Sequence, residues 1–175
     1  MLVAIDPSIR ACGVALFTNE SELIGATTIM DVDDTKPLSW RIQEIALRVK
    51  KYVIDSTMVP NIELLITEWP QSYAGKTRDS NDLFGLCAIP FAVAGHTIPV
   101  RAYTPREWSG QIPKSTRKST ANTSPRAKRI KSRLTRKELK HWPEGQHDAI
   151  DSVGIGLHYF GRLNPVRIFP GATDD

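Results

Sequence analysis

Two acidic residues near the end of the chain have the spacing of a paired metal site. Asp148 and Asp151 are three positions apart and open the apolar run 153–160. Residues three apart share one face of a helix, so both carboxylates would point into one small volume. Two carboxylates at such a short distance repel one another unless a hard cation such as Mg²⁺ or Mn²⁺ lies between them. The alternative is that acids in a first helical turn simply favour the positive end of the helix dipole.

Two further acids follow runs that are typical of buried strands. The apolar run 2–5 ends at Asp6, and the run 62–67 ends at Glu68. An acid placed directly after a buried strand lies at the rim of the sheet, where α/β folds gather functional groups. An Asp-Pro turn would also explain Asp6. Two strand-terminal acids together with a helical pair predict a metal site assembled from several elements.

The elements that must position these acids predict one α/β domain. Apolar runs bounded by turn residues predict strands at 2–5, 11–17, 23–30, 62–67 and 98–103. Helical spacing and capping patterns predict helices at 38–54, 79–94 and 125–139, from Thr104 onward, and from Asp148 onward. Pro90 implies a kink or an early end of the second helix. This order predicts a three-layer α/β fold with a mixed five-stranded sheet flanked by helices.

A polycationic segment lies in an otherwise acidic chain. Residues 114–140 hold eleven Lys or Arg and one acid, a net of +10, and the remaining residues hold twelve basic and eighteen acidic side chains, a net of −6. A solvated helix face carries a few such charges, but a block this one-sided repels itself without a polyanionic partner. Nucleic acid is therefore the expected partner. Trp69 and Tyr73, close to Lys76 and Arg78, could stack on bases, although aromatic residues after a strand more often join the core.

Length and composition exclude several classes of protein. The 175 residues, 41% hydrophobic and 24% charged, predict a single domain over 1–175, with a mobile basic loop at 111–125 and a peripheral tail at 164–175. No apolar run is long enough to span a membrane and no leader is recognisable, so we expect no membrane association and a cytoplasmic location. Cys12 and Cys87 lack the spacing of a disulfide framework or a zinc site. There is no P-loop and no GxGxxG fingerprint.

Four segments resemble the RuvC family of Holliday-junction resolvases, within the ribonuclease H-like superfamily. Residues 5–8 with 12–15 resemble the family's first strand pair, and residues 66–68 resemble its second acidic strand. Residues 103–107 resemble a PxxxK-like segment, and residues 147–152 resemble the closing (H/D)xxDAxA helix. The resemblance spans residues 2 to 160, although Ser8 stands where the family has a glycine.

The resemblance implies that Asp6, Glu68, Asp148 and Asp151 are catalytic metal ligands for two Mg²⁺ or Mn²⁺ ions, with Asp6 bridging them. It further implies an endodeoxyribonuclease of DNA recombination and repair that resolves four-way junctions by paired symmetric nicks. In-line attack by water would leave a 5′-phosphate and a 3′-hydroxyl. The residues expected to bind DNA are Trp69, Tyr73, Lys76, Arg78, Lys114, Arg117, Lys118, Arg126, Lys128, Arg129 and Arg133.

The resemblance and the symmetry of a four-way junction both imply a homodimer. The apolar stripe of the helix 79–94 is unusually rich for a solvent face, so we expect the contact around Leu83, Leu86, Cys87 and Phe91.

Other functions share parts of this pattern. Another ribonuclease H-like nuclease, acting on RNA–DNA hybrids or flaps, would use the same four acids. A non-catalytic DNA-binding module would use the basic segment, but uncompensated carboxylates on a DNA-facing surface would repel phosphate. An actin-like or sugar-kinase ATPase would need a second phosphate-binding Asp-Gly motif and a chain usually more than twice this length.

Overall fold

A five-stranded mixed sheet forms the centre of the molecule. The computed structural model describes residues 1–57, 61–69, 80–110 and 123–163. The strands are β1 (Leu2–Asp6), β2 (Cys12–Phe17), β3 (Leu23–Ile29), β4 (Leu64–Glu68) and β5 (Val100–Tyr103), in the order β3-β2-β1-β4-β5. β1 pairs antiparallel with β2, and β2 with β3, whereas β1 pairs parallel with β4, and β4 with β5. The predicted mixed five-stranded sheet is confirmed.

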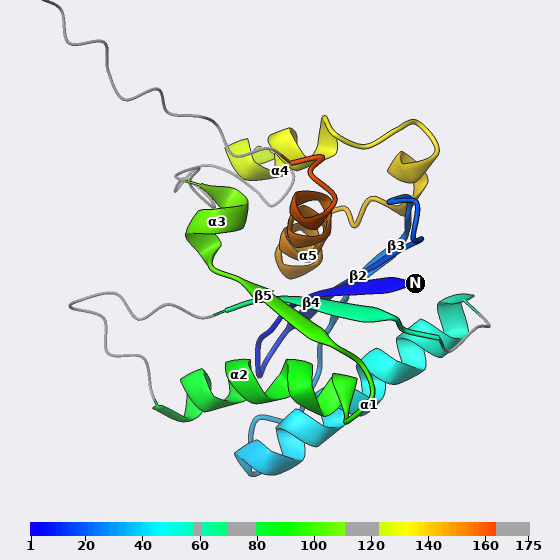
Figure 1. Cartoon of the computed structure of the whole chain (residues 1–175). Helices are drawn as coiled ribbons and strands as arrows, with labels where there is room; N and C mark the ends of the chain where they lie inside the picture. The colour runs from blue at the N-terminus through cyan, green and yellow to red at the C-terminus, as the bar shows by residue number, and fades with distance from the viewer. Residues whose placement is uncertain (58–60, 70–79, 111–122, 164–175) are drawn as a thin grey trace, which may run out of the picture.

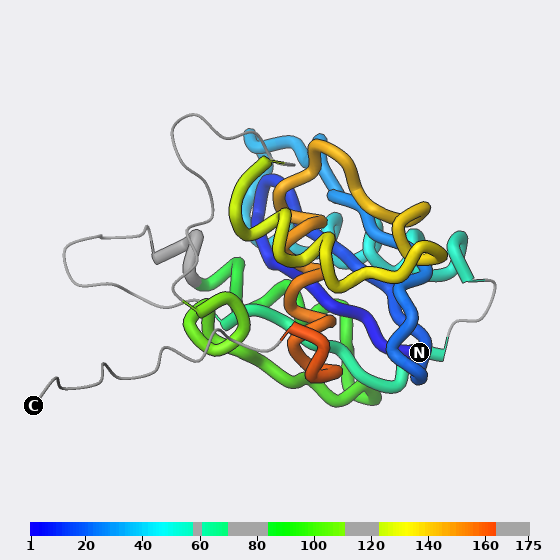
Figure 2. Tube along the Cα trace, turned by 90° about the horizontal axis from the view of Figure 1, so that it is seen from above, coloured from blue at the N-terminus to red at the C-terminus, as the bar shows by residue number. Residues whose placement is uncertain are grey.

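Helices cover both faces of this sheet. The helices are α1 (Leu38–Thr57), α2 (Ser80–Ala94), α3 (Pro105–Ser109), α4 (Pro125–Lys131), the 3₁₀ turn η2 (Glu138–His141) and α5 (His147–Tyr159). α1 and α2 lie on one face, and α5 lies on the other with α3 and α4 (Figure 1). Seen from above, α5 lies over the central strands with α4 beside it (Figure 2). The three-layer architecture is therefore confirmed.

Each face of the sheet has its own apolar core. Strand side chains point alternately to the two faces, so Ala4 and Phe17 pack beneath α5, whereas Ile5 and Leu16 pack against α1 and α2. All six residues of β2 are buried. A strand buried on both faces is held in one register, because a slip by one residue would exchange the two sets of side chains. The register of β1 and β2 determines where Asp6 emerges.

Local sequence patterns predicted most of the element boundaries. α3 begins with the expected capping box, in which Thr104 Oγ1 accepts from the Glu107 amide at 3.3 Å and the Glu107 carboxylate accepts from the Thr104 amide at 2.6 Å. α2 continues through Pro90 to Ala94, so the helix does not end early. No helix in the described part of the chain is long and apolar enough to cross a membrane.

The expected basic helix over 125–139 is wrong. α4 ends at Lys131, and the chain turns before η2. The turn forms because Glu138 and Thr135 exchange hydrogen bonds, with the Thr135 amide donating to Glu138 Oε2 at 2.7 Å and the Glu138 amide donating to Thr135 Oγ1 at 3.3 Å. This reciprocal pattern starts a new helical turn and so ends the previous one.

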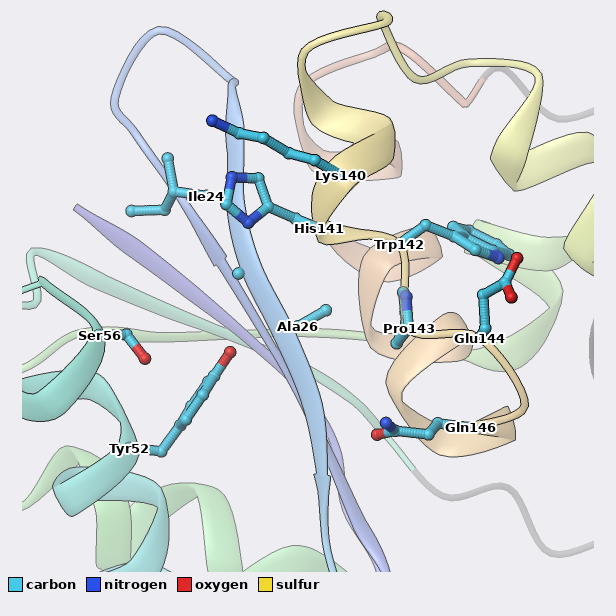
Figure 3. A pocket seen from close by; sticks show the side chains of 11 residues that line it. Ile24, Ala26, Tyr52, Ser56, Lys140, His141, Trp142, Pro143, Glu144 and Gln146 are labelled. Carbon is cyan, nitrogen blue, oxygen red and sulfur yellow. The ribbon is translucent and has the colours of Figure 1, made fainter.

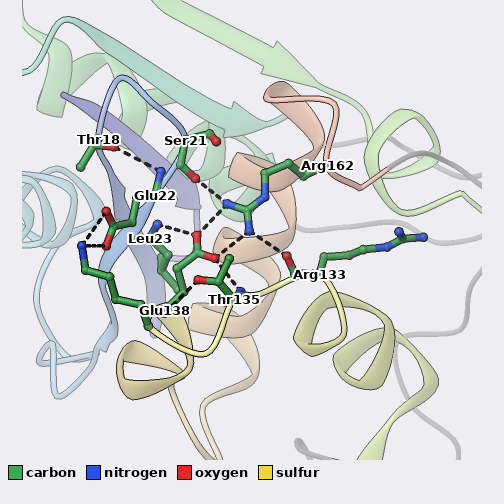
Figure 4. Close-up of polar contacts among 9 residues, drawn as sticks. Thr18, Ser21, Glu22, Leu23, Arg133, Thr135, Glu138 and Arg162 are labelled. Carbon is green, nitrogen blue, oxygen red and sulfur yellow. Dashed lines mark hydrogen bonds and ion pairs between the residues drawn. The ribbon is translucent and has the colours of Figure 1, made fainter.

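Glu138 also joins this turn to distant parts of the chain. Its side chain is 1% exposed, and it accepts from both terminal nitrogens of Arg162, at 2.6 and 2.7 Å, and from the Leu23 amide at 2.9 Å (Figure 4). Arg162 donates in addition to the carbonyls of Ser21 and Arg133. The lone acid of the basic segment is therefore a buried anchor between η2, β3 and the segment after α5. The core of the predicted mobile loop, residues 111–122, and the predicted tail, 164–175, lie outside the described residues.

Candidate active site

Asp6 and Glu68 end two neighbouring parallel strands at the same edge of the sheet. Ile5 on β1 pairs with Thr67 on β4, so the next residue of each strand is one of the two acids. Asp6 is 8% exposed and Glu68 is partly buried. The carboxyl ends of parallel strands are where open α/β sheets place their functional groups.

The N-terminus of α5 lies against the same edge. Asp6 pairs with Gly13 on β2, and a Cβ atom at Gly13 would lie 2.0 Å from the carbonyl oxygen of Asp148. Only a glycine lets the helix approach the strand this closely. Thr28 on β3 accepts from the Ala149 amide at 3.2 Å, and its own amide donates to Gln146 Oε1 at 2.7 Å. A strand side chain thus satisfies one of the open amides at the start of α5.

The Cys12 thiol is affected by the charges of two of the acids, Asp6 and Asp148. Burial raises the pKa of the Cys12 thiol, and the negative charges of Asp6 and Asp148 raise it further. A thiol in this environment stays protonated and is a poor nucleophile. Cys12 is completely buried in the core beneath α1 and α2.

Asp151 is buried and faces a cation. Its side chain is 5% exposed, and Arg126 Nη1 of α4 lies 3.2 Å from Asp151 Oδ2. Arg126 is itself only 14% exposed, and its Nη2 lies 3.3 Å from Ser109 Oγ. The guanidinium therefore points into the acidic edge and compensates a buried carboxylate there.

Glu68 is held by a tryptophan. Trp108 of α3 is fully buried, and its Nε1 donates to Glu68 Oε2 at 2.7 Å. The guanidinium carbon of Arg126 lies 5.0 Å from the centre of the Trp108 ring, within the range of a cation–π contact. One indole thus contacts both the partner of Asp151 and Glu68 itself.

The donor set at this edge suits a hard divalent cation. Asp6 and Glu68 end the paired strands β1 and β4, and Asp148 and Asp151 belong to the start of α5, which packs on β1 and β2. All four supply carboxylate oxygens, which Mg²⁺ and Mn²⁺ prefer. Within the described ranges, no three His, Cys, Asp or Glu side chains are drawn together closely enough to hold a metal ion. Two of the four carboxylates accept hydrogen bonds, Asp151 from Arg126 and Glu68 from Trp108.

The described basic residues beside this edge belong to α4 and the turn that follows it. Lys128 and Arg133 are exposed, and Arg129 is partly buried. Burial lowers the pKa of the Arg129 guanidinium, and the nearby charge of Arg133 lowers it further. Lys131, by contrast, lies 3.6 Å from Glu144 Oε1 and stacks over Trp142.

The aromatic residues expected to stack on bases are only partly described. Trp69 is 41% exposed directly after Glu68, and its amide donates to the Tyr103 carbonyl at 2.7 Å. The remaining predicted DNA-binding residues that lie outside the described part of the chain are Tyr73, Lys76, Arg78, Lys114, Arg117 and Lys118.

A separate pocket of about 450 Å³ lies beside β3, one of the two edge strands of the sheet. Tyr52 of α1 lines it from one side, and His141 and Gln146 line it from the connection between η2 and α5 (Figure 3). None of the four predicted metal ligands lines this pocket. Burial lowers the pKa of His141, with the charge of Lys140 acting in the same direction. The acidic edge and this pocket are therefore different places on the molecule.

Sequence reasoning missed two features of the acidic edge. Trp108 appeared only as a residue of a short predicted helix, and nothing in its spacing pointed to Glu68, which is forty positions away. Arg126 was expected on the DNA-binding surface, but its side chain lies inward on Asp151.

Comparison with solved structures supports the fold independently. RuvC of T. thermophilus in complex with a Holliday junction substrate aligns with a TM-score of 0.63 and 19% identity, covering 93% of this chain and 94% of that chain. A second Thermus thermophilus RuvC structure aligns with a TM-score of 0.58 and 18% identity, covering 94% and 99%. The yeast mitochondrial Holliday junction resolvase Ydc2 aligns with a TM-score of 0.54 and 12% identity, covering 93% and 79%. No family model matches the chain, and no curated protein matches it in sequence.

The sheet order and the helical layers are those of the ribonuclease H-like α/β fold. Its fold is that of the RuvC resolvases, which confirms at the level of structure the resemblance carried by residues 2 to 160.

Proposed function

We propose that this protein is a divalent-metal-dependent endodeoxyribonuclease that resolves four-way DNA junctions. One observation carries the proposal: the strand ends and the helix start that carry Asp6, Glu68, Asp148 and Asp151 lie at one edge of a sheet whose fold is similar to that of RuvC, and one of the similar structures is a complex with a Holliday junction substrate. Acids gathered on a DNA-facing surface repel phosphate unless cations bind them, so their convergence supports an enzyme over a simple DNA-binding module.

The four acids are the residues that would hold the cations. Asp6 ends β1, which pairs with β4 and with β2, and the start of α5 lies against β2 at Gly13, so Asp6, Glu68, Asp148 and Asp151 would together hold the ions. When bound, two Mg²⁺ or Mn²⁺ ions would activate water for in-line attack and stabilise the leaving oxygen, which yields a 5′-phosphate and a 3′-hydroxyl.

The basic residues would hold the DNA next to these acids. Lys128 and Arg133 present charge on the α4 side of the acidic edge, and the segment 114–118 supplies further charge in the sequence. Such contacts position the phosphate backbone and carry no sequence information. Trp69 is exposed directly after Glu68 and is the candidate for stacking on a base at the junction that lies in the described part of the chain.

We propose further that the working unit is a symmetric homodimer that contacts through α2. Phe91 is 52% exposed as expected, whereas Leu86 and Cys87 are partly buried and the side chain of Leu83 lies outside the described set. Phe84, which sequence reasoning did not select, is 64% exposed and lies two helical turns from Phe91 on the same face. Paired active sites would match the two equivalent strands of a junction.

Cleavage of a four-way junction with Mg²⁺ and with EDTA tests the proposed activity. Asp6→Asn, Glu68→Gln and Asp151→Asn should abolish cleavage and leave junction binding and the circular dichroism spectrum largely unchanged. Asp148→Asn should reduce cleavage less than the other three substitutions, because the adjacent His147 can partly substitute for the lost carboxylate. Asp55→Asn on α1, where the acid is exposed and pairs with Lys51, is the matched control and should cleave normally.

The outcomes separate the alternatives. Three variants are expected to be inactive. If any two of them cleaved the junction at the rate of the unaltered protein, the metal-site assignment would be refuted. Preferential cleavage of an RNA–DNA hybrid or a flap over the junction would favour another ribonuclease H-like nuclease. Junction binding with no metal-dependent cleavage of any of these substrates would favour the DNA-binding module.

A further inference from the structure

The indole of Trp108 occupies an unusual place for a core side chain. It is fully buried and belongs to the core beneath α5, and its N–H donates to Glu68 Oε2 at 2.7 Å. A buried indole N–H needs an acceptor, and a carboxylate is a stronger acceptor than a neutral oxygen. The contact therefore restrains both side chains, one from α3 and one from β4.

The face of the same ring carries the second connection. Arg126 stacks on it at 5.0 Å from the ring centre and reaches Asp151 Oδ2 at 3.2 Å. The edge of the indole thus contacts Glu68 while its face supports the partner of Asp151. Two of the proposed metal ligands, on different secondary-structure elements, depend on the orientation of one ring.

The ring itself is tightly held. A Cβ atom at Gly154 of α5 would lie 2.6 Å from Trp108 Cζ3 and 2.8 Å from Ile130 Cδ1, so the helix backbone packs directly on the indole. The capping box of Thr104 and Glu107 restrains the start of the short helix that carries it. A hydrogen-bond donor on such a support has little freedom to follow a moving carboxylate.

We propose that Trp108 is a positioning residue for the metal site, which holds the Glu68 carboxylate in the orientation that binds the cation. The inference rests on the proposed function, because it assigns a role toward the ions expected there. A carboxylate oriented before the ion arrives loses less conformational freedom on binding, so the hydrogen bond raises cation affinity. Loss of such an outer partner typically weakens metal binding by about 10- to 100-fold.

Two matched variants test this with no DNA present. Trp108→Phe removes the indole N–H and keeps a buried ring. Trp142→Phe removes the same atoms from a tryptophan that is 7% exposed, and whose Nε1 is buried with no hydrogen-bond partner in the described structure. Calorimetric titration with Mn²⁺ should show affinity about tenfold weaker for Trp108→Phe and within about twofold of the unaltered protein for Trp142→Phe. Equal affinities in the two variants would overturn the inference.

Nuclear magnetic resonance tests the same contact in the intact chain, should Trp108→Phe fail to fold. The sequence has four tryptophans and hence four indole N–H resonances. We expect the Trp108 resonance to shift on Glu68→Gln and on titration with Mg²⁺, while the Trp142 resonance stays in place. A Trp108 resonance insensitive to both changes would refute the proposed role.

Cleavage kinetics separate this inference from the proposed function. For Trp108→Phe, the Mg²⁺ concentration at half-maximal rate should rise about tenfold, while the rate at saturating Mg²⁺ should return to within about twofold of the unaltered value. A rate that stays low at saturating Mg²⁺ would indicate a merely structural role. A protein that binds Mn²⁺ but cleaves no substrate would refute the proposed function, and the two affinities would still decide the role of Trp108.

Discussion

Arg126 occupies the position of a built-in counterion at the acidic edge. Asp151 is 5% exposed, so its charge needs compensation when no metal is bound, and Arg126 supplies part of it. The same guanidinium supports Trp108. Its substitution should therefore affect stability most strongly in the absence of metal.

We expect Arg126→Gln to lower the free energy of unfolding by about 1–3 kcal/mol in EDTA, because a buried carboxylate loses a charged partner. Added Mg²⁺ should then raise the melting temperature more in the variant than in the unaltered protein, since the ion supplies positive charge. Differential scanning fluorimetry with and without Mg²⁺ measures both effects, with Arg136→Gln at an exposed position as the control. Equal Mg²⁺ shifts in all three proteins would contradict this account.

The pKa of the Glu138 carboxyl departs strongly from its ordinary value. Burial by itself raises its pKa, but the hydrogen bonds from Arg162, Leu23 and Thr135 outweigh burial and lower the pKa from 4.5 to about 2. When the pKa of an acid is lower in the folded than in the unfolded state, its ionised form stabilises the fold at pH values above the pKa of the unfolded chain. That stabilisation is lost as the pH falls from about 4.5 toward about 2.

Glu138→Gln should therefore lower the free energy of unfolding by about 3 kcal/mol at pH 7. The difference from the unaltered protein should shrink as the pH falls below about 4.5, because the carboxylate becomes protonated in the unfolded chain. Urea denaturation at several pH values measures this. Glu22→Gln removes a more exposed acid that pairs with Lys137, and it should change stability by less than about 1 kcal/mol at any pH. A pH-independent effect of Glu138→Gln would show that its charge is not responsible.

At the scale of elements, the contact between β2 and α5 places the helical acids beside the strand acids. Gly13 on β2 lies against the backbone of Asp148, and Gly156 further along α5 lies against the ring of Phe17. These two glycines let the helix lie close to the sheet along its length. The helix is buried from Ala149 to Leu157 as a result.

Gly13→Ala should displace the start of α5, because the new methyl group would lie 2.0 Å from a backbone oxygen that cannot rotate away. We expect the free energy of unfolding to fall by about 3 kcal/mol. The cleavage rate of the protein that remains folded should also fall, because two proposed ligands move with the helix. Thermal unfolding and junction cleavage measure the two effects. Gly95→Ala, at a positive φ of 62° with nothing within 4 Å of the new methyl group, should cost about 1 kcal/mol and leave cleavage intact.

At the scale of the whole molecule, the described basic residues of the segment 114–140 and the exposed phenylalanines of α2 lie on opposite sides of the sheet. α4 and the turn after it carry exposed basic residues on the side of α5, whereas α2 exposes Phe84 and Phe91 on the opposite side of the sheet (Figure 1). The proposed contacts with DNA and with a second copy would therefore lie on opposite faces. The two proposals can be tested independently.

Junction binding should depend strongly on salt. Lys128→Gln and Arg133→Gln should each reduce the slope of log affinity against log salt by about 0.9, because each removes one phosphate contact on a duplex arm. Lys51→Gln on α1, on the other face of the sheet, should leave the slope unchanged. Fluorescence anisotropy across a salt series measures the slopes. A slope that is flat between low and physiological salt would assign the basic segment another role.

Phe91→Glu should convert the proposed dimer into a monomer, because a charge cannot be buried at an apolar contact without a partner. Leu47→Glu, which places the same charge at a 63% exposed position on α1, should leave the dimer intact. Light scattering at micromolar concentration, with and without junction DNA, measures both. An unaltered protein that is monomeric in both samples and still makes paired symmetric incisions would refute the dimer.

Residue order alone predicted the features that depend on neighbouring residues. The strands, the capping box at Thr104 and the placement of Asp6 and Glu68 at strand ends follow from local periodicity and turn chemistry. The helical spacing of Asp148 and Asp151 is likewise local. The end of α4 is the exception, because the predicted helix 125–139 ran through Thr135 and Glu138, whose reciprocal hydrogen bonds start a new turn.

Only the tertiary structure determined which partners these side chains have. Arg126 lies on Asp151 rather than in solution, Trp108 holds Glu68, and Glu138 is anchored by Arg162. Each pair joins residues that are 24 to 40 positions apart, so no periodicity links them. Their contacts arise because close packing of α3, α4 and α5 over one sheet excludes water, and a buried polar group must then bond to whatever polar group the fold places beside it.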